Sequence, residues 1–211
     1  MRIDKIASQP DRAGRYTVSF SDGSTMRLYR QTVEDFGLYS GLELTDEQMK
    51  SLRSAAGAMS AKMRAVRIVA ASSVSEKDLE QRLIHKGEDP KQAKAAVQWM
   101  ADLNLVDDRN TAEQIVRRCV AKGYGIHRAK QALYEKKIPK EYWDEALADY
   151  PDQTDAITDY LQTHLIDADD ERALRKVIDA LMRRGHNYRQ IRLALEQMSV
   201  DADILPEDND G

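Results

Sequence analysis

The side chains of this 211-residue chain that could carry out chemistry are few and widely separated. A zinc site needs cysteine and histidine ligands at close spacing, which the five candidates do not provide: His85, His127, His164, His186 and Cys119. The acidic run at residues 167–171 lacks the central glycine and the terminal glutamate of a calcium-binding loop. We therefore expect no metal site, and we interpret the acidic run as a solvated linker that ends in a helix N-cap.

The sequence also lacks clear signatures of a catalytic nucleophile or of a nucleotide-binding loop. Cys119 lies on the apolar stripe of an expected helix. The neighbouring arginines could lower the pKa of its thiol, but a packed small hydrophobic side chain is the favoured interpretation. No Gly-x-Ser-x-Gly elbow is present, and Gly123-Tyr124-Gly125 lacks the spacing of a phosphate-binding loop. Asp107-Asp108 is explained by helix capping. We expect a protein that is not an enzyme and that needs no cofactor.

Basic residues are more informative, because the formal net charge of −4 hides a strong segregation of charge. Residues 114–140 contain eight lysines and arginines against one acid, and residues 172–192 contain seven against one. By contrast, residues 151–171 contain seven acids and residues 196–211 contain six, with no lysine or arginine in either stretch. Such blocks create local fields that the whole-chain sum conceals.

The basic blocks allow two interpretations. They could pair with the acidic stretches of the same chain, although a solvated helix face usually mixes both signs and these faces do not. Alternatively, they form a surface that binds phosphates or an acidic protein partner. The second interpretation gives these candidate contact residues, chosen by charge: Arg117, Arg118, Lys122, Arg128, Lys130, Lys136, Lys137, Arg172, Arg175, Lys176, Arg183, Arg184, Arg189 and Arg192.

An internal repeat predicts the elements that position these residues. Residues 75–100 match residues 125–150 without a gap, and a third copy follows 48 residues further on. A period near 50 residues is typical of small helical units that bury their apolar faces against their neighbours. Apolar residues in the last two helices are spaced for a buried stripe, so the cations there, Arg189 and Arg192 included, should point outward.

The first part of the chain differs from the repeats. Residues 1–30 alternate apolar and polar side chains, which predicts an antiparallel β segment of two or three strands. Thr45-Asp46-Glu47-Gln48 is a capping box, and the sequence leaves open whether the helix that it begins runs unbroken or breaks near Gly57. The fold class is mainly α, with tandem three-helix repeats preceded by a small β segment. The expected domains are 1–60 (β segment plus helix), 61–105, 106–150 and 151–198 (three repeats) and 199–211 (a disordered acidic tail).

Bulk properties suggest where the protein acts. A single cysteine fits a reducing compartment. No apolar run is long enough to span a bilayer, and the first residues lack the apolar stretch of a signal peptide. We expect a cytoplasmic protein. Because no heptad stripe requires a dimer, we also expect a monomer.

Three sequence elements stand in a distinctive order. They are Ser75-Glu76-x-Asp78-Leu79-x-x-x-Leu83-x-x-Lys86-Gly87, Leu105-Val106-Asp107-Asp108-x-x-x-Ala112, and a third formed by Gly125, Ala129, Leu133, Lys136 and Ile138. Together they resemble the RecX family of recombination regulators. In the third element Ala129 replaces the usual isoleucine, and Lys137 the usual glycine. Because Lys137 carries a Cβ, we expect it to avoid the left-handed backbone conformation that glycine would tolerate. The resemblance covers residues 60–198 and agrees with the threefold repeat.

The resemblance implies a specific function. RecX proteins are tandem three-helix repeats that bind the RecA recombinase filament along its groove and inhibit its ATPase, strand-exchange and co-protease activities. This chain would then modulate recombination, DNA repair and the SOS response. Its partners would be the RecA filament and single- and double-stranded DNA, contacted directly or through the filament. The resemblance also implies that the chain is not an enzyme.

Two other functions remain open at this point. The chain could be a free-standing DNA-binding or transcription module, because three-helix units resemble helix-turn-helix domains. Salt-dependent, sequence-selective binding to naked duplex would favour that function. It could also be a helical-repeat scaffold for acidic proteins, and binding unaffected by nuclease would favour that one.

Overall fold

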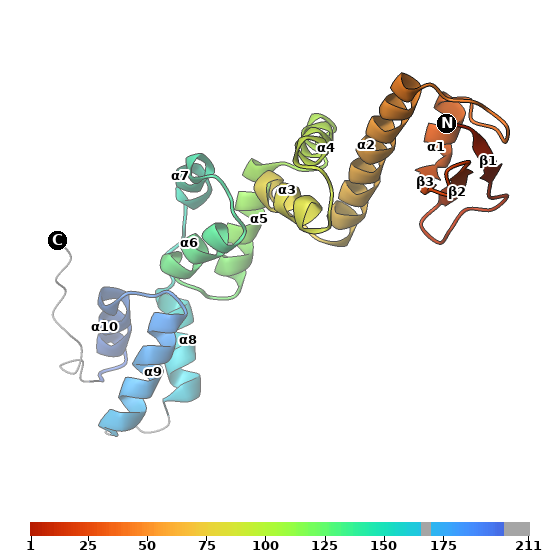
Figure 1. The fold of residues 1–211 in the computed structure, drawn as a ribbon. Coiled ribbons are helices and arrows are strands. Elements are labelled where there is room, and N and C mark those ends of the chain that lie inside the picture. Colours follow the sequence, from red (N-terminus) through yellow and green to blue (C-terminus); the bar gives the residue numbers. More distant parts are fainter. Residues whose placement is uncertain (166–169, 201–211) are drawn as a thin grey trace. The chain divides into compact units, whose positions relative to one another are not determined.

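The computed structural model describes residues 1–165 and 170–200 (Figure 1). The chain divides into two compact units, one formed by Met1–Val106 and one that begins at Asp107. The first unit contains a sheet and a helical bundle, and the second contains helices in the part that the structure describes. The sequence-based fold class is confirmed. Of the expected acidic tail, residues 201–211 lie outside the described ranges.

A three-stranded antiparallel sheet opens the first unit. Strands β1 (Ile3–Ile6), β2 (Arg15–Phe20) and β3 (Thr25–Tyr29) lie in the order β1-β2-β3. The alternation in the sequence places Val18, Phe20 and Leu28 on the buried face. A three-stranded sheet of this size needs a partner surface. The short helix α1 (Arg30–Asp35) and the beginning of α2 (Asp46–Ala71) supply it.

Helix α2 is one continuous helix of 26 residues, so it does not break near Gly57. Its predicted capping box is present: the Thr45 hydroxyl accepts from the Gln48 N–H at 3.2 Å, and the Gln48 side-chain oxygen accepts from the Thr45 N–H at 2.9 Å. The first half of α2 packs on the sheet through Met49 and Leu52. The second half packs in a different core. The expected domain boundary between residues 60 and 61 therefore falls inside a single helix.

The second half of α2 completes the first helical bundle with α3 (Glu76–His85) and α4 (Pro90–Asp102), as Figure 1 shows. Ser75 caps α3, and Asp89 caps α4, in which Pro90 occupies the first helical position. Buried Leu79, Leu83 and Met100 fill the core between them. The cap residues fix where each helix begins, and the apolar stripe fixes which face turns inward.

The second unit contains two further bundles. The first consists of α5 (Asp108–Ala121), α6 (Ile126–Glu135), the 3₁₀ helix η1 (Lys140–Tyr142) and α7 (Trp143–Leu147). The second consists of α8 (Thr154–His164), α9 (Glu171–Arg183) and α10 (Tyr188–Gln197). Each has its own hydrophobic core. No helix in the described parts of the chain has the length and apolarity needed to cross a membrane.

The middle helix of each bundle ends in the same way, in a Schellman motif. Gly87, Lys137 and Gly185 follow α3, α6 and α9, and all three have positive φ, of 88°, 57° and 88°. In each motif the next residue donates its N–H back to the last turn of the helix, at 3.1 to 3.2 Å. The expectation that Lys137 avoids the left-handed conformation is therefore wrong. The hydrogen bonds of the motif and the burial of Ile138 impose the conformation that glycine adopts in the other two copies.

Candidate functional site

The fourteen candidate cations lie on α5, α6, α9 and α10 and at the ends of these helices. Ten of them are exposed: Arg117, Arg118, Lys122, Lys130, Lys136, Arg172, Arg175, Lys176, Arg183 and Arg189. Four are half-buried: Arg128, Lys137, Arg184 and Arg192. The expectation that Arg192 points fully outward is therefore too simple, because α10 packs with part of this side chain covered.

Some of these cations pair with an acid on their own helix. Arg117 Nη1 lies 3.7 Å from Glu113 Oε2, Arg128 Nη1 lies 3.0 Å from Glu135 Oε1, and Arg175 pairs with Glu171. The hydrogen bond from Arg128 is the main reason that the pKa of Glu135 is lowered. Within residues 1–165 and 170–200, six others form no ion pair: Arg118, Lys130, Arg172, Lys176, Arg183 and Arg189. Intramolecular ion pairing thus leaves these six cations without an acidic partner among the described residues.

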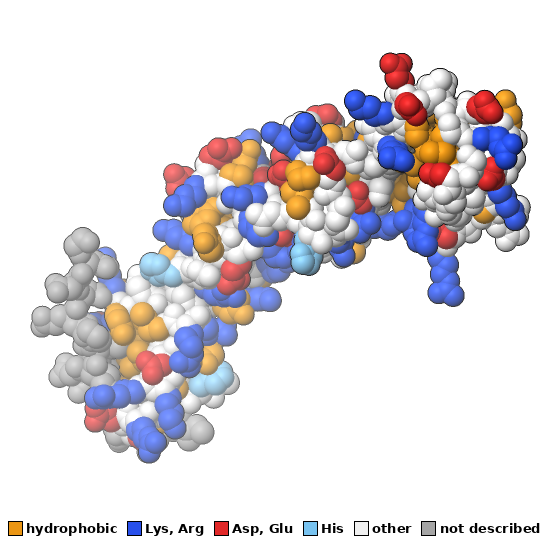
Figure 2. All heavy atoms as spheres, viewed as in Figure 1, with side chains coloured by type: hydrophobic (Ala, Val, Ile, Leu, Met, Phe, Trp, Pro, Cys, Tyr) orange, Lys and Arg blue, Asp and Glu red, His pale blue; other side chains and the backbone are white. Residues whose placement is uncertain are grey.

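Basic side chains are visible on the surface of the second unit. In Figure 2, lysine and arginine side chains gather over the α8–α10 bundle on the face in view. Sequence reasoning overlooked an aromatic neighbour on α6, Tyr134, whose exposed fraction is 69%. Tyr134 follows Lys130 by four residues on α6, so the two side chains lie along one side of the helix. An exposed aromatic ring beside a cation is typical of surfaces that contact single-stranded nucleic acid.

Arg184 has a structural role that the charge pattern did not predict. Its Nη2 donates to the backbone oxygen of Lys122 at 2.8 Å. Its guanidinium carbon lies 5.0 Å from the ring centroid of Tyr124 and 4.9 Å from that of Tyr160. The side chain is therefore enclosed between the second and third repeats and is engaged there. We remove Arg184 from the candidate contacts, whereas its neighbour Arg183 is exposed and stays among them.

The second and third repeats are joined through the turns that follow α5 and α9. The N–H of Gly125 donates to Arg184 O at 3.0 Å, and the N–H of His127 donates to Gly185 O at 3.3 Å. His186 lies beside them, 1% exposed, with Nε2 at 3.1 Å from Gly123 O. Burial is the main reason that the pKa of His186 is lowered, so its neutral form is favoured. These contacts hold the cations of α6 and α9 on one body.

Cys119 is a packed residue. Its side chain lies in the core of the second bundle and is 6% exposed. Burial raises the pKa of the thiol, and this effect exceeds the opposite influence of Arg128, Lys122 and Arg118. The interpretation of Cys119 as a small hydrophobic side chain is confirmed. Among the described residues, no group of three or more histidine, cysteine or acidic side chains is arranged to hold a metal ion.

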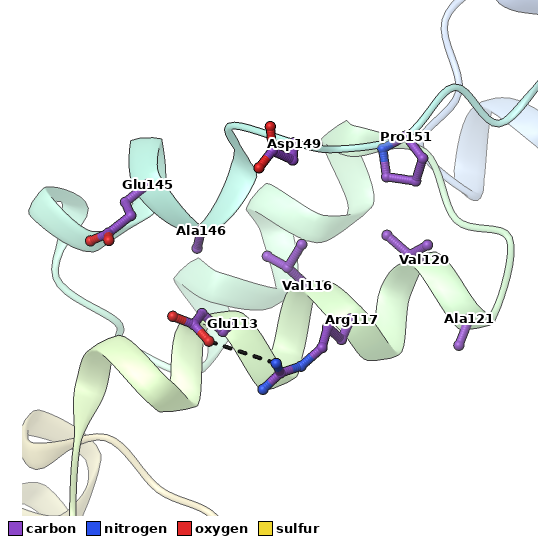
Figure 3. A pocket seen from close by; sticks show the side chains of 9 residues that line it. All are labelled: Glu113, Val116, Arg117, Val120, Ala121, Glu145, Ala146, Asp149 and Pro151. Carbon is purple, nitrogen blue, oxygen red and sulfur yellow. Dashed lines mark ion pairs between the residues drawn. The ribbon is translucent and has the colours of Figure 1, made fainter.

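A groove of about 590 Å³ lies in the second unit between α5 and the segment from α7 to Pro151. Figure 3 shows Val116 and Val120 projecting from α5 toward this segment, which carries Ala146 and Pro151. Glu113, Glu145 and Asp149 also line the groove. Glu113 pairs with Arg117 and Glu145 with Arg109, so two of the three carboxylates are already partnered. The groove is thus apolar with a partly neutralised acidic rim.

Comparisons with known proteins agree with this architecture. A family model described as RecX, second three-helix domain, matches residues 107–147, which contain α5, α6, η1 and α7. The regulatory protein RecX of Halorhodospira halophila (strain DSM 244 / SL1) is 31% identical over 159 residues, covering 72% of this chain and 98% of that protein. That of Vibrio campbellii (strain ATCC BAA-1116) is 29% identical over 140 residues, covering 65% of this chain and 90% of that protein.

The solved structures show the same fold. A crystal structure of a regulatory protein RecX matches with a TM-score of 0.64 at 19% identity, covering 92% of this chain and 98% of that chain. A crystal structure of RecX from Lactobacillus salivarius matches with a TM-score of 0.59 and covers 70% of this chain and 99% of that chain. The Halorhodospira halophila relative is 31% identical and aligns over nearly all of its own length. The chain therefore belongs to the RecX family of regulatory proteins.

Proposed function

We propose that this chain binds RecA recombinase filaments and inhibits their ATPase, strand-exchange and co-protease activities, and so modulates recombination and DNA repair. The family supports a regulatory function. The observation that carries the proposal further is the set of six exposed cations on α5, α6, α9 and α10 that form no ion pair with the described residues. A DNA-loaded filament is a polyanion, and a surface of this charge is complementary to it.

The contact residues that we propose are the initial set without Arg184. Their two strongest members are Arg118 and Arg183, which are exposed and form no ion pair with the described residues. Each contacts either RecA or DNA within the filament. A regulator that acts by binding needs no catalytic group, and the buried, high-pKa thiol of Cys119 fits that role.

The experiment that tests this proposal is a titration of RecA from the same organism with the purified chain, following single-stranded-DNA-dependent ATP hydrolysis. We expect inhibition at low stoichiometry. Arg183→Glu should weaken inhibition several-fold, as expected for reversing a charge in an electrostatic interface. Lys50→Glu, which reverses an exposed charge on α2 outside the proposed surface, is the matched control.

Two outcomes would contradict the proposal. Unchanged ATP hydrolysis and strand exchange at stoichiometric excess of the chain would remove RecA as the partner. If the same protein bound naked duplex tightly and with sequence preference, the free-standing DNA-binding module would become the better hypothesis.

A further inference from the structure

A second basic site lies in the first unit, away from the cations considered so far. It is a cleft of about 460 Å³ between the sheet, the C-terminal half of α2 and α3. Figure 2 shows lysine and arginine side chains in this region, between the sheet and α2. Five cationic residues and four small or apolar ones line the cleft: Arg15, Arg64, Arg67, Arg82, Lys86, Ala13, Ile68, Ala71 and Ser72. No carboxylate is among these lining residues.

Three of the five cations are held by acids outside the lining. Arg15 lies 2.8 Å from Asp11, Arg64 lies 2.7 Å from Glu88, and Arg82 lies 2.8 Å from Asp78. The pairs fix the positions of these guanidinium groups in advance of any ligand. An arginine has five N–H donors, so each of the three keeps donors beyond those that its acid accepts.

The other two cations have no acidic partner in the cleft. Arg67 donates from Nη2 to neutral oxygens, the Tyr29 hydroxyl at 2.6 Å and the Ala13 carbonyl at 3.3 Å. Lys86 ends α3 with its side chain exposed. Five positive charges against three partner carboxylates therefore leave a surplus of two in one small space.

A purely structural role accounts for only part of this cluster. Arg67 does tie α2 to the sheet, and Arg15 does brace its own turn through Asp11. Arg64 and Arg82 neutralise the buried carboxylates of Glu88 and Asp78. None of these roles explains why Lys86 lies at the same cleft, or why five cations line it together. Concentrating like charges costs free energy unless a counter-ion is bound. Arginine forks suit phosphate oxygens in particular, because two N–H donors can bind two oxygens.

We propose that this cleft binds the phosphate groups of a nucleic-acid strand. The cations of the lining come from β2, α2 and the end of α3, a spread that suits the successive phosphates of a strand. The other lining residues are small or apolar and supply no paired donor and acceptor for a base edge. The contact is therefore independent of sequence. The site lies outside the proposed RecA-contacting residues, and its test contains no RecA, so each proposal can fail without the other.

The test uses the full chain and measures binding of a fluorescent 20-nucleotide oligothymidylate by anisotropy over a range of salt. Lys86→Gln should weaken binding about threefold and reduce the slope of log K against log salt by about 0.7, the value for one lost phosphate contact on a single strand. Lys86→Glu should weaken binding further. Lys77→Gln and Lys77→Glu are the matched controls, because Lys77 is an exposed lysine on the same helix outside the cleft.

A second measurement locates the effect. Amide signals of residues 64–72 and 82–87 are followed by NMR during addition of the oligonucleotide, and separately of inorganic pyrophosphate, which carries the same chemistry without a strand. Shifts with the oligonucleotide at concentrations where pyrophosphate has no effect support a strand site. Shifts with pyrophosphate alone would overturn the strand as the ligand. Unshifted amides with both probes, or equal losses of affinity for the Lys77 and Lys86 variants, would overturn the site itself.

Discussion

Lys137 holds a left-handed backbone conformation, with φ at 57°, that a lysine adopts only at a cost in free energy. The two equivalent positions, Gly87 and Gly185, carry the residue that adopts it freely. We therefore predict that Lys137→Gly stabilises the protein by about 0.5–1 kcal/mol, after allowing for the greater entropy of glycine in the unfolded chain. Urea unfolding of both proteins under one set of conditions measures the difference.

The matching substitution in the first repeat provides the control. A Cβ at Gly87 would meet no atom within 4 Å, so Gly87→Ala tests the backbone conformation without a steric clash. It should destabilise the chain by about 1 kcal/mol. If Lys137→Gly were instead destabilising, contacts of the lysine side chain would outweigh the strain of its backbone.

At the scale of elements, the joint between the second and third repeats depends on how closely two backbone turns approach. Gly125 has an ordinary φ of −74°, so a Cβ there would cause no backbone strain. The same Cβ would overlap the carbonyl group of Gly185 on the facing turn. The residue is glycine because of what it faces and not because of its own conformation.

We predict that Gly125→Ala separates the two turns. The hydrogen bond from Gly125 to Arg184 O and that from His127 to Gly185 O would both be lost, at about 1 kcal/mol each. Amide hydrogen exchange should then accelerate at residues 123–127 and 184–187, while the cores of α5 and α9 stay protected. Unchanged exchange at both turns would show that the joint tolerates the extra methyl group.

His186 makes the same joint sensitive to pH. Its pKa is lowered in the folded protein, mainly by burial and secondarily by the charge of Arg184. The unfolded chain therefore binds a proton on this residue at a higher pH than the folded chain does. The contribution of His186 to the free energy of unfolding is fully present above its pKa in the unfolded chain, near 6.5. It falls as the pH drops toward the pKa of His186 in the folded protein, by at most about 1.4 kcal/mol per pH unit.

The measurement is the free energy of unfolding between about pH 7.5 and about pH 5.5. Ile138 occupies the equivalent buried position after α6, so His186→Ile places a side chain that a sister repeat already accommodates. The variant loses the hydrogen bond to Gly123 at every pH, whereas its loss of stability on acidification should be smaller than that of the natural protein. Equal losses would mean that His186 is not the titrating group.

Local patterns predicted much of this fold, and the exceptions are tertiary. The predicted helix beginnings rest on cap residues such as Ser75 and Asp89, whose side chains bind the first-turn N–H groups as expected. The inward position of Arg184 could not be predicted, because it depends on the Lys122 carbonyl 62 residues away. The basic cleft of the first unit was not predicted either, because acidic residues lie between its cations in the sequence and hide the concentration of positive charge. The sequence held one weak indication of the cleft: Arg64 and Arg67 are three residues apart on α2, so both lie on one face of that helix.

At the scale of the whole molecule, net charge opposes the proposed function. The chain carries −4 overall, although the proposed surfaces are basic. Five of its carboxylates lie in residues 201–211, outside the described ranges: Asp201, Asp203, Glu207, Asp208 and Asp210. Ending the chain at Val200 changes the formal net charge from −4 to +1. A less negative protein is repelled less by a polyanion.

We predict that the chain ending at Val200 binds the same oligonucleotide about two- to tenfold more tightly at low salt. The gain should shrink as salt rises from about 50 mM to about 200 mM, because salt screens exposed charges beyond about 10 Å. A full-length chain with its five terminal carboxylates changed to amides separates charge from length, and it should bind as the truncated chain does. If only truncation tightened binding, the segment would act by occupying the surface, and charge would not be the cause. If neither change altered affinity, the basic faces would already bind independently of the acidic segment.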